Sequence, residues 1–364
     1  MRNTAAVLER NGIPFRVLDI DPGGNRTGHD LSLGKHFIEA GRPLPHPVNL
    51  FVMNPPGLES LFRDLPGVVE TRNRMNVCIP FWELLRLPLS WKPVLDTMDL
   101  VLAPSRFVLE AMDAAGVAAP RLHYPQWMPL PEAVPDRERW GMPAGRTVFL
   151  FSFDISSGIQ KKNPLGAMEA FRQAFPDGHA ELWLKVNNRD LSTEAGQVVD
   201  RLKAVAARVP GVRVIDRTLA YRDVLSLYAS ADVFFSLHRG EGLGLGMMEC
   251  MALGKPVIAT GWSGNMDFMD AENSCLVPFD LVPVGEGTQY QAVSQGLEQQ
   301  WAEPSVEAAA RWMAKLDASP ELRGKIGAEA KASICRHLDQ AGQGNVFREV
   351  RSLVKSRPGG IAIA

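Results

Sequence analysis

Short apolar runs alternate with longer amphipathic stretches along this chain. The runs are rich in β-branched and aromatic residues, as strands are, and the stretches between them have helical spacing. Near-continuous apolar runs such as Leu100–Ala103 fit parallel strands that are covered on both faces. The alternation predicts an α/β fold with doubly wound sheets. In the first half we expect strands over Pro14–Ile20, Pro47–Asn54, Met75–Phe81, Leu100–Ala103 and Arg121–Tyr124.

The pattern is interrupted near the middle of the chain. Between Met128 and Gly145 there are four prolines, two glycines and little apolar periodicity, which is typical of an interdomain connection. We expect a first domain over 1–135, a linker over 136–146, a second domain over 147–340, and a helix and tail over 341–364 that pack back on the first domain. Second-half strands are expected over Thr147–Phe153, Leu182–Val186, Val212–Ile215, Asp232–Leu237, Pro256–Thr260 and Ser274–Val277.

Length and charge narrow the class of protein. A chain of 364 residues suits two Rossmann-like domains facing a cleft, with ligands at the carboxyl ends of the strands. The formal net charge of −2 gives no argument for nucleic acid, and no run approaches the roughly 20 apolar residues of a membrane span. The 4 cysteines lack C-x-x-C pairing and the 7 histidines lack ligand spacing. We therefore expect reduced thiols, a cytoplasmic location and no metal.

A glycine-rich turn carries the most specific chemical signal. It follows the strand Asp232–Leu237 and leads into a helical pattern that starts near Leu245. A strand, a glycine turn and a helix start direct several backbone N–H groups at one point, which suits a phosphate or diphosphate. The absent Cβ atoms of Gly242 and Gly244 allow a ligand to approach the backbone.

Two carboxylates, Glu241 and Glu249, bracket this turn. An acidic group repels a phosphate, so we expect each to accept hydrogen bonds from a diol on another part of the ligand. The alternative is that both are surface or helix-dipole residues. The apolar composition Met247-Met248 and Cys250-Met251 favours a buried helix instead.

Several motifs in one order resemble glycosyltransferase family 4, in particular bacterial members that build cell-surface polysaccharides. The glycine turn resembles the E-x(7)-E signature of that family. The other matching segments are Phe153–Ser157, Lys161–Pro164, Gly254–Thr260, Trp262–Asn265, Trp82–Leu84 and Ala103–Phe107. The resemblance implies the two-domain GT-B fold, transfer from a UDP- or GDP-sugar with retention of configuration, and no metal.

The resemblance also implies roles for individual residues. Catalysis needs positive charge at the leaving diphosphate, which Lys162 would supply together with the amides of Gly242, Leu243 and Gly244. Glu241 would hold the sugar hydroxyls, and Glu249 would hold the ribose diol.

Two more lysines are candidates for the phosphates. Lys161 stands where the family more often has arginine, so bidentate phosphate binding there is in doubt. Lys185, within the strand Leu182–Val186, is either a phosphate ligand or a surface lysine whose charged end reaches solvent.

Other positions at strand ends complete the predicted site. His238 and Arg239 follow the strand Asp232–Leu237, and we expect both to face the donor. In the first domain Trp82, Glu83 and Asn54 would line the acceptor side, the alternative for Trp82 being an ordinary core tryptophan.

Three weaker signals have favoured structural explanations. The stretch Trp82–Leu95 could rest on a membrane, but core packing is favoured, because Pro88 and Pro93 interrupt a helix. Asp19-Ile20-Asp21 is formally a D-x-D metal motif and is better explained as a turn before Pro22-Gly23. The spacing Gly242-x-Gly244-x-Gly246 departs from the dinucleotide fingerprint, so an oxidoreductase is disfavoured.

We therefore predict a glycosyltransferase that moves a hexose-type sugar to a saccharide or lipid-linked acceptor, in the cytoplasm or at the inner face of its membrane. A sugar-nucleotide epimerase of the same fold is one alternative. An inactive donor-binding or scaffolding homologue is another, because the chain opens with a helix, Thr4–Arg10, where the family has a strand and a glycine-rich loop. Base recognition is expected near Asp216–Leu219. The sequence is silent on the oligomeric state.

Overall fold

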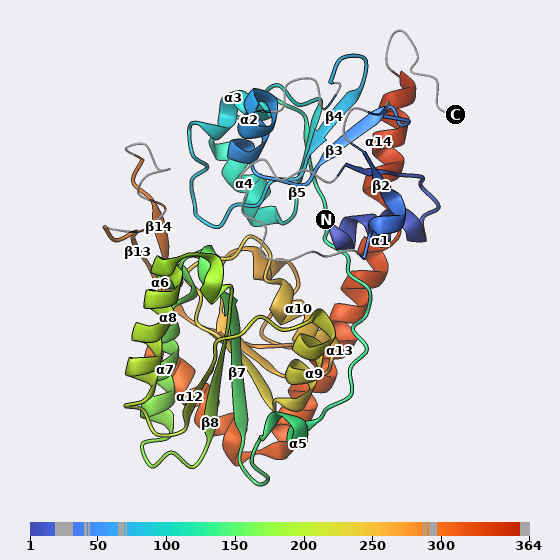
Figure 1. Ribbon diagram of the computed structural model, residues 1–364. Helices are drawn as coiled ribbons and strands as arrows, with labels where there is room; N and C mark the ends of the chain where they lie inside the picture. Colours follow the sequence, from blue (N-terminus) through green and yellow to red (C-terminus); the bar gives the residue numbers. More distant parts are fainter. Residues whose placement is uncertain are drawn as a thin grey trace. The chain divides into compact units, whose positions relative to one another are not determined.

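The computed structural model describes residues 1–18, 32–39, 42, 44–64, 69, 71–286, 288, 290 and 297–356. The described residues divide into two compact units (Figure 1). Unit 1 lies within Met1–Pro129, Val293–Leu297 and Leu338–Ala364, and unit 2 lies within Leu130–Ala292 and Glu298–His337.

Unit 2 is built on a parallel sheet of six strands in the order β12-β11-β10-β7-β8-β9. Most residues of the central strands are apolar and buried, as expected for strands that are covered on both faces. The strands are β7 (Val148–Asp154), β8 (Glu181–Asn187), β9 (Val212–Ile215), β10 (Val233–Ser236), β11 (Val257–Thr260) and β12 (Cys275–Val277).

Helices cover both faces of this sheet. Figure 1 shows α7 (Pro164–Ala174), α8 (Thr193–Ala206) and α12 (Val306–Ala318) on one side. The opposite side carries α9 (Tyr221–Ser230), α10 (Leu245–Ala252) and α13 (Pro320–Ala341). The order of strand, helix and strand is that of a doubly wound domain.

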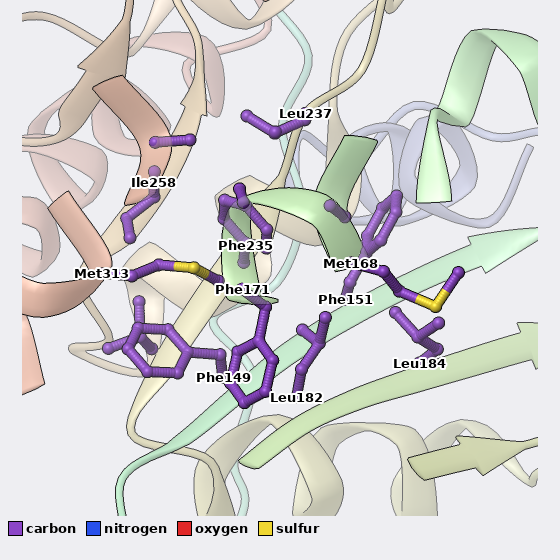
Figure 2. Packing of buried hydrophobic residues seen from close by; sticks show 14 of the residues in the cluster. Phe149, Phe151, Met168, Phe171, Leu182, Leu184, Phe235, Leu237, Ile258 and Met313 are labelled. Atoms are coloured by element: carbon purple, nitrogen blue, oxygen red, sulfur yellow. The ribbon is translucent and has the colours of Figure 1, made fainter. Parts of the chain in front are cut away.

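The main core of unit 2 lies between β7, β8 and the helices α7 and α12. Figure 2 shows Phe149 and Phe171 packed together, with Phe235 and Met313 nearby. All four side chains are fully buried. Removal of this much aromatic and aliphatic surface from water stabilises the sheet on which the glycine turn is mounted.

Unit 1 contains a second parallel sheet, of order β3-β4-β5-β6, and a separate parallel pair of β1 and β2. Apolar side chains of α1 (Arg2–Arg10) and α14 (Asn345–Ser356) pack in one cluster with those of the larger sheet. The strands are β1 (Val17–Leu18), β2 (Phe37–Ile38), β3 (Val48–Phe51), β4 (Met75–Cys78), β5 (Leu100–Ala103) and β6 (Arg121–His123). The other helices are α2 (Pro55–Asp64), α3 (Trp91–Leu95) and α4 (Arg106–Ala114).

The start of the chain differs from the predicted strand Pro14–Ile20. The described strand there is only β1, and it pairs with β2 rather than with the four-stranded sheet. Pro14 lacks an N–H for a strand ladder, and the Ile13 N–H caps α1 by donating to the Leu8 carbonyl at 2.9 Å. The Asp19-Ile20-Asp21 motif lies outside the described residues.

The segment 136–146, for which a linker is predicted, contains a short helix, α5 (Arg137–Trp140). Asp136 caps this helix by accepting from the Arg139 N–H at 3.0 Å. Arg137 forms an ion pair with Asp232 at 2.9 Å, and its guanidinium also donates to the Ser230 carbonyl. The segment is therefore bonded to the body of unit 2.

Two strands near the end of unit 2 escaped prediction. β13 (Phe279–Pro283) and β14 (Gln300–Pro304) pair antiparallel, outside the large sheet. The exposed pattern of β13 lacks a regular apolar alternation, so the sequence gives no strand signal there.

Candidate functional site

The predicted glycine turn joins β10 to α10. Gly244 is the residue before α10 and has a φ of 95°, a left-handed conformation that favours glycine. A Cβ at this position would lie 2.4 Å from the Met247 Cε atom. The backbone conformation of the turn therefore favours glycine at this position, and the flexible end of Met247 would have to move for any larger residue.

A second segment, after β11, supports the turn from the side. The Gly264 N–H donates to the Glu241 carbonyl at 2.9 Å, and the Glu241 N–H donates to the Ser263 Oγ at 2.9 Å. A Cβ on Gly264 would lie 2.3 Å from the Gly242 carbonyl oxygen. Ser263 itself has a φ of 78°, which is strained for a serine. The two backbones are therefore in direct contact, and this contact fixes the shape of the turn.

Lys162 and Glu241 form an ion pair across the site. Lys162 is the last residue of α6 (Ile159–Lys162), and its Nζ atom contacts the Glu241 Oε1 atom. The side chains are 13% and 15% exposed, so the pair is shielded without being sealed from solvent. Burial alone would raise the pKa of Glu241, but the charges of Lys162 and Lys161 outweigh it and lower that pKa to about 2. Glu241 is therefore ionised at any ordinary pH.

Glu249 lies inside α10 and is 5% exposed. The hydroxyl of Tyr221, the first residue of α9, donates to its Oε1 atom at 2.7 Å. The burial of Glu249 and the shielding of Glu241 argue against the alternative that both are surface residues. The glycine turn and α10 thus hold two carboxylates whose negative charge is shielded from water.

Lys161 is buried, with only 1% of its surface exposed. Its Nζ atom lies 5.8 Å from the centre of the Tyr290 ring, and its carbonyl accepts the Arg239 N–H at 2.8 Å. Lys161 therefore contributes positive charge from behind Lys162, and its backbone connects α6 to the end of β10.

Lys185 is completely buried, so the alternative of a surface lysine is wrong. Its Nζ atom donates to the Val186 carbonyl and to the Asn187 Oδ1 atom. Burial is the main cause of the lowering of its pKa to about 8, and the nearby charges are those of Asp154, Asp216 and Arg217. The hydrogen-bond partners of Lys185 that are named above thus lie at the end of its own strand, β8.

His238 is fully buried, and neither ring nitrogen has a hydrogen-bond partner among the described residues. Burial is the main cause of the lowering of its pKa to about 4; Glu241 opposes the lowering, and Lys162 and Lys161 add to it. His238 is therefore a neutral ring beneath the charged pair at neutral pH.

The side chain of Arg239 contacts other residues of unit 2. Its guanidinium forms a two-pronged ion pair with Glu303 at 2.7 and 2.9 Å and donates to the Gln160 carbonyl at 2.7 Å. The same group lies 5.1 Å from the centre of the Trp301 ring. These contacts join β14 to α6, and the donor-facing role of Arg239 stays a prediction.

The acceptor-side candidates Asn54, Trp82 and Glu83 are neighbours within unit 1. The Asn54 Oδ1 atom accepts the Phe81 N–H at 2.7 Å, which ties the end of β3 to the segment after β4. Trp82 is buried, donates from Nε1 to the Arg86 carbonyl at 2.9 Å and packs on Trp91 with ring centres 4.9 Å apart.

The stretch Trp82–Leu95 is chiefly a core segment. Its buried apolar side chains are Trp82, Leu84, Leu87, Trp91 and Leu95, while Leu85 and Leu89 are exposed. Over the described ranges, no helix has the length and apolar character needed to cross a membrane. The same residues contain no group of three His, Cys, Asp or Glu side chains that could hold a metal ion.

A separate hollow of about 330 Å³ lies on the β8–β9 side of the sheet in unit 2. It contains Asp216 and Arg217, the first residues of the loop for which base recognition is predicted. Asp216 is already paired with Arg189 at 2.7 Å and with Lys203 at 2.9 Å. Its carboxylate therefore holds the loop in place.

The sequence indicates no functional role for Tyr221 or Ser263. Tyr221 is 28 residues from Glu249 along the chain, and no motif marks it. Ser263 lies inside a segment that resembles the family, but its contact with the Glu241 backbone depends on the packing of two loops. Only its position after a buried strand could have suggested a role.

Comparison with known proteins agrees with this geometry. Residues 167–308 match the model of the family described as "Glycosyl transferases group 1", a match that includes the glycine turn and both carboxylates. No curated protein matches the chain by sequence search.

Solved structures with a similar fold share little sequence with the chain. Sucrose-phosphate synthase from Thermosynechococcus elongatus superposes with a TM-score of 0.61 at 17% identity, covering 85% of this chain and 75% of that one. HepE from Anabaena, solved with UDP-glucose, gives a TM-score of 0.60 at 18% identity, covering 77% and 72%. TarM from S. aureus, solved with UDP, gives 0.56 at 12% identity, covering 82% and 53%.

These likenesses establish the fold, and the predicted α/β architecture with two Rossmann-like domains is confirmed. The segment 167–308 matches the glycosyl transferases group 1 model, and the chain that contains it has the GT-B fold.

Proposed function

We propose that this glycosyltransferase moves a hexose-type sugar from a nucleoside diphosphate to a saccharide acceptor with retention of anomeric configuration. The observation that carries the proposal is the glycine turn with its ion pair, which places the Lys162 ammonium against Glu241 at the start of α10. A partly buried ammonium and a helix start favour an anionic group there, and the adjacent carboxylate favours hydroxyls.

The roles follow from the charges. During transfer the bond from the anomeric carbon to the diphosphate breaks, a bond to the acceptor oxygen forms, and the acceptor proton leaves with the diphosphate. Lys162 stabilises the negative charge that grows on the leaving group, with the amides of Gly242, Leu243 and Gly244. An ammonium has three donors, so Lys162 can serve both a phosphate and Glu241.

The two carboxylates hold the remainder of the donor. Glu241 accepts hydrogen bonds from the sugar hydroxyls, and Glu249 accepts them from the ribose. Lys161 adds charge from below without reaching the ligand. We assign Asn54 and Glu83 to the acceptor side, with Trp82 as part of the core that supports them.

UDP-sugars are the first donors to test, because the solved HepE structure named above contains UDP-glucose. GDP-sugars are the second candidate. A lipid-linked saccharide acceptor, and with it a place at the inner face of the cytoplasmic membrane, remains a proposal that vesicles carrying such an acceptor would test.

The test incubates the chain with UDP- and GDP-sugars, with and without saccharide acceptors, and identifies the products by mass and NMR. We expect release of the nucleoside diphosphate and a glycoside of the same anomeric configuration as the donor. A changed sugar nucleotide formed without acceptor would establish the epimerase alternative. Donor binding without any product would establish an inactive homologue.

A further inference from the structure

Tyr221 connects the first turn of α9 to the middle of α10. Its hydroxyl donates to the Glu249 Oε1 atom at 2.7 Å. Glu249 is 5% exposed, whereas Tyr221 is 43% exposed. The hydrogen bond therefore lies at the boundary between the interior of unit 2 and solvent, where a ligand can reach one partner without unfolding the other.

A buried carboxylate has a fixed direction only if a donor holds it. Without such a donor the charge is costly to bury and the side chain changes rotamer or attracts a proton. A carboxylate has about four lone-pair sites, so the bond from Tyr221 leaves room for further donors on the same group. Tyr221 thus orients an acceptor suited to neutral hydroxyls and unsuited to phosphate oxygens.

The hydroxyl of Tyr221 can be removed without removing its ring. Tyr221 is 43% exposed, and phenylalanine at this position would keep the apolar surface that the ring buries. Loss of its hydroxyl removes the hydrogen bond to Glu249. The loss therefore acts directly on the buried carboxylate.

We propose that Tyr221 is a positioning residue that holds Glu249 against the donor ribose and makes the chain select ribonucleoside diphosphates over 2′-deoxyribonucleoside diphosphates. The inference rests on the proposed function, in which Glu249 binds the ribose. A 2′-deoxy ligand leaves the oriented, buried carboxylate one donor short. Sites built to hydrogen-bond a hydroxyl reject ligands that lack it.

The experiment measures calorimetric binding of UDP and 2′-deoxy-UDP, and of GDP and 2′-deoxy-GDP, to the full chain. Wild type, Tyr221→Phe and Glu249→Ala are compared with Tyr124→Phe, which removes a phenol hydroxyl in unit 1. We expect wild type and Tyr124→Phe to prefer the ribonucleotide by at least about tenfold. In Tyr221→Phe the ratio should fall to about threefold or less, because ribonucleotide binding weakens while deoxyribonucleotide binding changes little.

Each other outcome has a distinct meaning. A wild-type ratio in Tyr221→Phe together with a lost ratio in Glu249→Ala overturns the inference and leaves the ribose assignment intact. Equal binding of both ligands by wild type overturns the inference and the role of Glu249. No binding of any of the four nucleotides overturns the proposed donor site itself. Should Glu249→Ala fail to fold, Tyr221→Phe, altered at an exposed ring, still decides the inference.

Discussion

At the scale of single residues, the site joins strong charges to an uncharged buried ring. Lys162 and Glu241 neutralise each other, so removal of either partner would leave the other charge shielded from water without its counterion. His238, beneath them, is kept neutral by burial. The neutral state of this ring makes the free energy of unfolding depend on pH.

We expect His238 to make the protein less stable in mild acid. Its pKa of about 4 lies below the value of 6.5 for the unfolded chain, so the unfolded state binds the extra proton as pH falls through this window. Stability is complete above about pH 6.5, and this group removes about 2 kcal/mol of it between pH 7 and pH 5.

Chemical unfolding of wild type and His238→Phe at the two pH values checks this expectation. The variant cannot take up the proton, so its free energy of unfolding should fall by about 2 kcal/mol less than that of wild type over the interval. An equal fall in both proteins would show that His238 is not responsible.

At the scale of elements, the turn between β10 and α10 depends on the segment after β11. The Gly264 backbone is held against Gly242 with no room for a side chain. Because Gly264 also donates to the Glu241 carbonyl, any displacement of one loop moves the other. The geometry of the predicted donor site is therefore a property of two loops.

Gly264→Ala should displace the turn. The new Cβ atom would lie 2.3 Å from the Gly242 carbonyl oxygen, which is backbone and cannot rotate away. We expect a loss of about 1–3 kcal/mol in the free energy of unfolding and at least about tenfold weaker binding of nucleoside diphosphate.

Gly324→Ala is the matched control, because Gly324 lies within α13 and has open space around its Cα atom. An alanine in such a helix should stabilise the protein by about 0.5–1 kcal/mol and leave binding unchanged. Normal nucleotide affinity in Gly264→Ala would contradict the coupling of the two loops.

The sequence predicts those elements whose signal is local. The buried strands of unit 2 are mostly apolar, and the start of α10 is marked by glycines, so both were found. β13 was missed because its partly exposed residues lack a clear apolar alternation, and β1 differs from its prediction because it pairs with β2 outside the larger sheet.

Side-chain pairings were the least predictable. The partners in Lys162–Glu241, Arg239–Glu303 and Tyr221–Glu249 are 79, 64 and 28 residues apart along the chain. Apolar periodicity carries no information on such distances. The sequence therefore predicts the residue types of the candidate site, but their mutual contacts required the fold.

At the scale of the whole molecule, the chain forms two units, and the last helix belongs to the unit that the first helix opens. Phe347, Val350 and Val354 of α14 are buried in the same cluster as Val7 of α1. Helix α14 is thus part of the core of unit 1. The glycine turn and both carboxylates lie in unit 2.

Phe347→Ala should therefore destabilise unit 1 selectively. Phe347 is 6% exposed and packs edge-on against Tyr124, so its loss should cost about 3–5 kcal/mol. Leu353→Ala, on an exposed position of the same helix, should cost less than about 1 kcal/mol. Thermal unfolding with and without nucleotide measures both, and nucleotide-dependent stabilisation of unit 2 should persist in Phe347→Ala.

The central claim, that Lys162 and Glu241 form the catalytic part of a donor site, is tested most directly by single-turnover transfer from the preferred sugar nucleotide. Lys162→Ala and Glu241→Gln should each lower the rate constant by about 10²-fold or more, because each removes charge or hydrogen bonding at the reacting groups. Lys325→Ala, which removes an exposed lysine of α13, should keep the wild-type rate. Near-wild-type rates in both site variants would contradict the account.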